Sequence, residues 1–148
     1  LPGSKVLLGD GPHLETLKKN FPDVTYTGYL PLEDLPRYLS TADVFVFPSR
    51  TDTFGIVMLE AMASGVPVAA FPVVGPKDVV EHGVSGWLDR DLAKAIAGAR
   101  NLPPAGPLAR AATFPWSRSV EQLERALEPI SRCAPSTSSN SSPENMVF

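Results

Sequence analysis

Two apolar segments with a helix-forming segment between them most constrain the fold of this chain. The apolar segments are Asp43–Phe47 and Val66–Phe71. Strands that are apolar on both faces are typical of parallel sheets covered by helices on both sides. Phe54–Ser64 lies between them, is rich in helix formers and is followed by Gly65. The pattern predicts a strand–helix–strand crossover, and with it an α/β fold with a doubly wound parallel sheet.

The loop that precedes the predicted helix is the first candidate for a ligand site. Pro48–Phe54 follows a strand, and doubly wound sheets bind ligands at the carboxyl ends of their strands. The first N–H groups of a helix have no acceptor within it and lie at the positive end of its dipole. Gly55 would let a ligand come close to the backbone. Together these features predict an anion site suited to phosphate.

Two acidic residues lie in the same stretch. Asp52 is in the loop, and Glu60, eight residues later, is the only charged residue between Phe54 and Ala70. A carboxylate on so apolar a helix is costly to bury without a partner. Two interpretations stay open: Glu60 faces water along an exposed stripe, or it accepts hydrogen bonds from a ligand hydroxyl.

The rest of the chain continues the alternation of strands and helices. Further strands are expected at Lys5–Leu8, Val24–Thr27 and Gly86–Leu88. Further helices are expected at His13–Asn20, Glu33–Ser40, Lys77–His82, Asp91–Asn101, Leu108–Thr113 and Ser117–Leu127. Pro103–Pro107 is expected to break the chain between two of these helices, and Ser117 to cap the last one.

A glycine-rich turn follows the first predicted strand. Gly9-Asp10-Gly11-Pro12 lies between that strand and a helix. Glycines in this position can cradle a phosphate, or they can simply make a tight turn. Both interpretations stay open for Gly9 and Gly11.

Composition limits the classes of function. The net charge is −3, so the chain lacks the basic footprint of a nucleic-acid-binding protein. Cys133 is the single cysteine, which excludes an intrachain disulfide and a multi-cysteine metal site. No apolar run approaches the roughly 20 residues of a membrane span. We expect one domain over residues 1–130 and a disordered Ser/Pro-rich tail over residues 131–148.

An ordered set of motifs resembles the retaining glycosyltransferases of family 4 (group 1), which have the GT-B architecture of two Rossmann-like domains. Their signature is an acid, seven residues and a glutamate, filled here by Asp52 and Glu60. The resemblance also includes, in order, Gly9–Pro12, Phe21–Gly28, Ala42–Ser49 and Gly75–Val80. It covers roughly residues 1–127, and its wording is closest to sulfoquinovosyl- and mannosyl-transferring lipid glycosyltransferases.

The resemblance implies that this chain is the C-terminal, donor-binding half of a GT-B enzyme. The enzyme would transfer a hexose from a UDP- or GDP-linked sugar to a lipid or glycan acceptor, without a metal or other cofactor. Relatives carry one more strand–helix unit and an N-terminal Rossmann domain before the equivalent of Leu1. We therefore expect an inactive fragment of a cytoplasmic enzyme, which would contact a membrane peripherally through the N-terminal domain.

Two other classes of function stay open. The chain could be a non-catalytic module that binds a nucleotide sugar and transfers nothing. It could also belong to a nucleotide-sugar epimerase, because such enzymes share the architecture and also need an acid pair. The reading frame upstream would separate transfer from a binding module, since only an acceptor-binding domain there supports transfer.

Residue roles follow from the resemblance. Catalytic roles fall to Asp52, which would hold hydroxyls of the donor sugar, and Glu60, which would hold those of the ribose. Backbone N–H groups at Phe54, Gly55, Ile56 and Val57 would face the sugar and phosphates. Gly9 and Gly11 are further donor-binding candidates. Asp52 stands where the family usually has glutamate, so its carboxylate is one methylene closer to the backbone.

Other candidates lie in neighbouring loops. Tyr26–Leu30 follows a predicted strand where relatives hold the nucleotide base, which makes Tyr29 and Leu30 candidate base contacts. Arg50 is close enough in sequence to reach a phosphate, although an exposed loop arginine is the commoner role. The loop Gly75–Asp78 reads G-P-x-D where the family more often has G-G-x-x-E, so its role at the sugar is open.

Overall fold

The structure is a computed structural model that describes residues 3–127. Within that part, all five expected strands and all seven expected helices are present. The chain divides into two units, Leu1–Pro115 and Trp116–Phe148. The predicted disordered tail, residues 131–148, lies outside the described residues, and a single domain over residues 1–130 stays a prediction.

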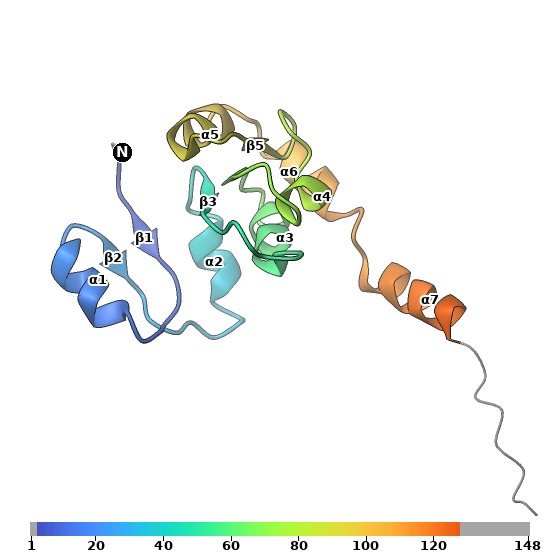
Figure 1. The fold of residues 1–148 in the computed structure, drawn as a ribbon, viewed down its shortest axis with the longest axis horizontal. Coiled ribbons are helices and arrows are strands. Elements are labelled where there is room, and N and C mark those ends of the chain that lie inside the picture. The colour runs from blue at the N-terminus through green and yellow to red at the C-terminus, as the bar shows by residue number, and fades with distance from the viewer. Residues whose placement is uncertain (1–2, 128–148) are drawn as a thin grey trace, which may run out of the picture. The chain divides into compact units, whose positions relative to one another are not determined.

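The main sheet of the first unit consists of three parallel strands. They are β3 (Phe45–Phe47), β4 (Val68–Ala70) and β5 (Gly86–Leu88), in that order across the sheet. Figure 1 labels β3 and β5. Each joins the next through a helix, α3 (Ile56–Ala63) and then α4 (Pro76–Val79). The predicted strand–helix–strand crossover is therefore confirmed, with Phe45 paired to Val68 in register.

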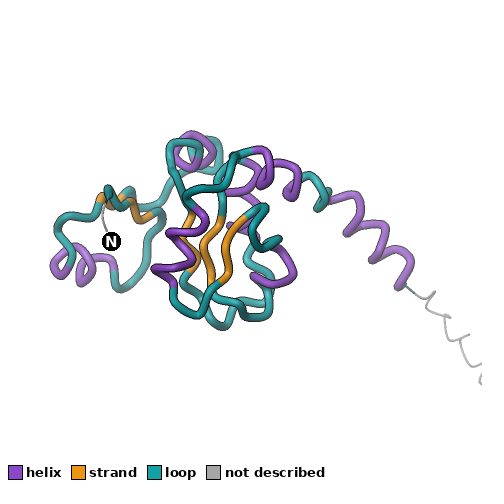
Figure 2. Tube along the Cα trace, turned by 90° about the horizontal axis from the view of Figure 1, so that it is seen from above, coloured by secondary structure: helices purple, strands orange, loops and turns teal. Residues whose placement is uncertain are grey.

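Helices cover both faces of this sheet. Successive residues of a strand point to opposite sides, so neighbouring residues of β4 pack against different helices. On one face, Val68 and Ala70 of β4 pack with Met58 and Met62 of α3. On the other, Ala69 packs with α5 (Leu92–Ala99). All three β4 residues are fully buried. Figure 2 shows the strands between helices, which confirms the doubly wound arrangement.

The two N-terminal strands form a separate parallel pair. β1 (Val6–Leu7) pairs with β2 (Thr25–Tyr26), and α1 (Leu14–Asn20) connects them. Among the described residues, neither strand of this pair is hydrogen-bonded to β3 as part of the same sheet, whereas the sequence suggested one continuous sheet. The pair buries little apolar surface, since Val6 is 55% exposed. Leu8, just after β1, packs against the main core.

Three further helices complete the described chain. They are α2 (Leu35–Leu39), α6 (Ala105–Ala111) and, in the second unit, α7 (Trp116–Ala126). The expected break at Pro103–Pro107 is wrong in part, because α6 already begins at Ala105. Pro107 is tolerated there because the first turn of a helix does not need its N–H groups. Ser117 lies within α7, so its predicted capping role is also wrong.

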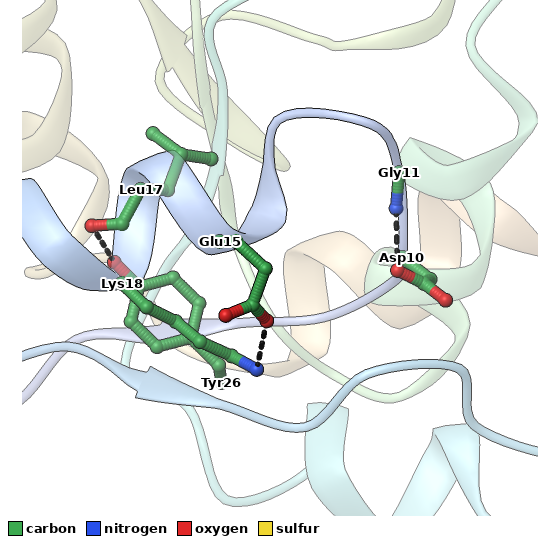
Figure 3. Close-up of polar contacts among 6 residues, drawn as sticks. All are labelled: Asp10, Gly11, Glu15, Leu17, Lys18 and Tyr26. Atoms are coloured by element: carbon green, nitrogen blue, oxygen red, sulfur yellow. Dashed lines mark hydrogen bonds and ion pairs between the residues drawn. The ribbon is translucent and has the colours of Figure 1, made fainter.

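Tyr26 connects β2 to the end of α1 through hydrogen bonds of its hydroxyl group. Its hydroxyl lies 2.9 Å from the carbonyl oxygen of Leu17 and 3.1 Å from that of Phe21. Figure 3 shows the side chain reaching this helix, beside an ion pair of 2.8 Å between Lys18 and Glu15. The hydrogen bond and charge of Glu15 raise the pKa of Lys18. Tyr26 therefore has a structural role in this chain.

We expect Tyr26→Phe to lower the free energy of unfolding by about 1 kcal/mol, the usual net value of one hydrogen bond. Urea unfolding followed by circular dichroism measures this change. Tyr29→Phe is the matched control, because Tyr29 is 79% exposed and its hydroxyl has no hydrogen-bond partner among the described residues. Equal stability of both variants and the parent chain would contradict the structural role of Tyr26.

No helix among residues 3–127 combines the length and the apolar character that crossing a membrane requires.

Candidate functional site

The start of α3 presents several backbone donors that have no acceptor among residues 3–127. Gly55 precedes the helix with φ +71°, a left-handed conformation that favours glycine. Within the described part of the chain, the N–H groups of Gly55, Ile56 and Val57 have no hydrogen-bond acceptor. They lie at the positive end of the helix dipole. Donors in this position could bind an anion. Binding of phosphate there stays a prediction.

Exposed apolar side chains surround these donors. Phe54, Ile56 and Val57 are 44%, 46% and 39% exposed, while the opposite side of α3 is fully buried through Met58, Ala61 and Met62. Exposed apolar residues next to free donors suit a ligand that has both an apolar and an anionic part.

The loop before α3 is held by a neighbouring loop. Gly75 has φ +88°, and a Cβ atom there would lie 2.7 Å from the carbonyl oxygen of Asp52 and 3.2 Å from the carbonyl carbon of Thr53. The carboxylate of Asp52 accepts a hydrogen bond of 3.0 Å from the N–H of Phe54. The structure thus brings the loop around Asp52 and the loop around Gly75 into direct contact.

Glu60 lies one turn into α3, on the face that also carries Ile56 and Val57. It is half-buried, and its carboxylate has no hydrogen-bond or ion-pair partner among residues 3–127. It lines a surface pocket of about 260 Å³ together with residues of α3, α2 and the segment before α2, namely Leu32, Leu35, Pro36, Leu39, Ala63 and Ser64. Glu60 thus lies on an accessible face, beside an apolar pocket. Both interpretations, exposure to water and binding of a ligand hydroxyl, stay open.

The remaining candidates are dispersed. The guanidinium of Arg50 lies over the ring of Phe71, 4.1 Å from its centre, which is a cation–π contact. Leu30 lines a second surface groove, beside Asp34 and Tyr38. Tyr29 is largely exposed. Contact of these three side chains with a donor stays a prediction.

Gly9 and Gly11 have their N–H groups already occupied. Gly9 donates to the carbonyl oxygen of Gly28 at 3.0 Å, and Gly11 donates to the carboxylate of Asp10 at 2.7 Å (Figure 3 shows the second bond). Gly9 also adopts φ +114°, which a tight turn requires. The turn interpretation is thus accounted for, while contact of these glycines with a donor stays a prediction.

Within residues 3–127, no group of three or more His, Cys, Asp or Glu side chains is arranged to hold a metal ion. Independence of a metal stays a prediction.

Sequence reasoning missed the pocket wall beside Glu60. Leu32, Leu35 and Leu39 recur at spacings of three and four residues, which is the helical signal that could have indicated a shared face. That signal does not show that the face meets α3, because contact between α2 and α3 depends on the tertiary fold.

Comparison with known families identifies the class of protein. The model of the family "Glycosyl transferases group 1" matches residues 4–101, and the chain belongs to this family.

Curated relatives are named glycosyltransferases. The chain is 39% identical over 94 residues to sulfoquinovosyl transferase SQD2 of Arabidopsis thaliana, covering 60% of this chain and 18% of that protein. It is 42% identical over 94 residues to a GDP-mannose-dependent alpha-(1-6)-phosphatidylinositol monomannoside mannosyltransferase of Mycobacterium tuberculosis, covering 55% and 24%. The chain thus spans about a quarter or less of the length of these relatives.

A solved structure shares the fold. The pneumococcal O-GlcNAc transferase GtfA, in complex with UDP and GlcNAc, superposes with a TM-score of 0.69 at 19% identity, covering 83% of this chain and 28% of that one. The α/β, Rossmann-like fold of a GT-B glycosyltransferase is therefore confirmed.

Proposed function

We propose that this chain is the donor-binding part of a retaining hexosyltransferase that uses a UDP- or GDP-linked sugar and a lipid or glycan acceptor. One observation carries the proposal. Among residues 3–127, three backbone N–H groups at the start of α3 have no acceptor, and the carboxylate of Glu60, one turn further along the helix, has no partner. A nucleoside diphosphate needs this combination, since its phosphates accept hydrogen bonds and its ribose hydroxyls donate them.

The residues divide the donor between them. The N–H groups of Gly55, Ile56 and Val57 would bind phosphate oxygens and stabilise the charge that develops on the leaving diphosphate. Glu60 would accept hydrogen bonds from the ribose. Asp52, whose loop lies against Gly75, would hold hydroxyls of the sugar. The apolar pocket beside Glu60 offers a surface for the base.

The names of relatives support the classes of donor and acceptor. One relative is named GDP-mannose-dependent, and one structural neighbour was solved with UDP, so the base stays open between guanine and uracil. The sulfoquinovosyl and phosphatidylinositol mannoside relatives support a lipid acceptor. Retention of configuration, independence of a metal and a cytoplasmic location complete the proposal.

Calorimetric titration of the chain with UDP, GDP and ADP tests the proposal. We expect saturable binding of one of the first two and none of ADP. The titration is repeated with EDTA present, which should not change the affinity if no metal takes part. A chain that is folded by circular dichroism and binds no nucleoside diphosphate would overturn the proposal.

A further inference from the structure

Arg110 of α6 reaches across to the end of α4. Its Nε donates to the carbonyl oxygen of Val79 at 2.8 Å, and its Nη2 donates to that of Asp78, also at 2.8 Å. The last carbonyl groups of a helix have no donor within the helix. A guanidinium is planar and rigid, so two such bonds fix the orientation of α4 against α6.

A series of ring contacts leads from the same guanidinium to the loop before α3. It lies over the ring of Phe114, 4.8 Å from the ring centre. Phe114 in turn meets Phe54 edge to face, with ring centres 6.1 Å apart and planes at 71°. Both contacts are favourable geometries for aromatic rings. Because Phe54 directly precedes Gly55, this series of contacts ends beside the N–H groups of residues 55–57, which have no acceptor in the part of the chain that the structure describes.

A second route runs from Arg110 through α4 itself. α4 is preceded by Gly75, which lies against the backbone of Asp52 and Thr53. The position of α6 is fixed by close packing on two sides. It packs along α3, and its Gly106 lies so near Val84 that a Cβ atom on the glycine would overlap the carbonyl oxygen of Val84. The two routes therefore converge on residues 52–54, one from the backbone side and one through a side chain.

We propose that Arg110 is a positioning residue that sets the conformation of residues 52–55 and thereby the diphosphate- and sugar-binding part of the site. The proposal rests on the donor site proposed above. Glu60 lies outside both routes, because its surroundings come from α2 and from α3. Loss of Arg110 should therefore weaken binding of the diphosphate and sugar and leave recognition of the nucleoside unchanged.

The first experiment uses the chain without a ligand. Backbone amide shifts are recorded for the parent chain, Arg110→Gln, Arg110→Lys and Phe114→Leu. Arg110→Lys keeps the charge but loses the planar pair of donors. Arg100→Gln is the matched control, because it removes the same charge from the exposed C-terminal end of α5. We expect the amides of residues 52–55 to shift in all three test variants, the amide of Gly75 to shift in the two Arg110 variants, and all of them to stay in place in the control.

The second experiment separates positioning from a general loss of structure. Nucleoside monophosphate, nucleoside diphosphate and nucleotide sugar are titrated into each variant. We expect Arg110→Gln to weaken nucleotide-sugar binding about tenfold and to leave nucleoside monophosphate binding within about twofold, on a scale where 1.4 kcal/mol is tenfold. Equal weakening of all three ligands would overturn the proposal, because a merely structural role predicts it.

The outcomes distinguish this inference from the proposed function. If the parent chain binds no nucleotide, the proposed function fails, and the amide shifts still decide whether Arg110 sets residues 52–55. If Arg110→Gln does not fold, Arg110→Lys and Phe114→Leu carry the test. Unchanged amides of residues 52–55 in those folded variants would overturn the positioning role.

Discussion

Glu60→Ala lowers the affinity of the chain for its preferred nucleoside diphosphate by about tenfold to a hundredfold in our account. This range corresponds to about 1.5–3 kcal/mol, the usual contribution of hydrogen bonds to a charged group. The free energy of unfolding should not fall, because the carboxylate has no partner among the described residues and alanine is the best helix former. Calorimetry and a thermal melt on the same sample measure both quantities.

Two control variants make this prediction specific. Glu60→Gln keeps the shape of the side chain and loses its charge, so its affinity should lie between those of the parent chain and Glu60→Ala. Glu124→Ala makes the same substitution on an exposed face of α7 and should leave binding unchanged. An affinity for Glu60→Ala equal to that of the parent chain would contradict the ribose-binding role.

Gly75→Ala should destabilise the first unit by about 2–4 kcal/mol, the combined effect of a left-handed conformation and of overpacking. The new Cβ atom would lie 2.7 Å from the backbone oxygen of Asp52, and a backbone atom cannot move aside as the end of a side chain can. The same displacement would disturb the loop before α3. We therefore expect both a lower midpoint in urea and weaker binding of the nucleoside diphosphate.

Gly83→Ala separates the two causes. Gly83 also has a left-handed φ, +80°, but a Cβ atom there would have no atom within 4 Å. It should lose only the conformational part, about 1–2 kcal/mol, and should bind the nucleotide normally. Equal losses of stability in Gly75→Ala and Gly83→Ala would show that the two loops are not in firm contact.

Local patterns predicted the central part of the fold well. The two apolar strands and the helix between them are where Asp43–Phe47, Phe54–Ser64 and Val66–Phe71 indicated, with shorter boundaries. Burial on both faces explains this success, since β4 cannot alternate between polar and apolar residues when helices cover both sides. The acid pair and the free start of α3 were also visible in sequence, because their spacing is local.

Contacts between distant segments were not visible. Nothing in the sequence around Gly75 indicates that it lies against Asp52. Likewise, nothing in the sequence around Arg110 indicates that its side chain reaches α4. The separation of β1 and β2 from the main sheet was missed for the same reason. Hydrogen bonds of this kind depend on how elements pack, and a periodic pattern reports only which face of an element is apolar.

The central claim is that a nucleoside diphosphate binds at the start of α3, with its ribose on Glu60. Mapping of amide shifts during titration with UDP and with GDP tests this claim most directly. We predict the largest shifts at Gly55, Ile56 and Val57, a smaller group around Glu60 and Leu32, and none in α5. Saturable binding that shifts amides elsewhere and leaves residues 55–60 unchanged would contradict the claim.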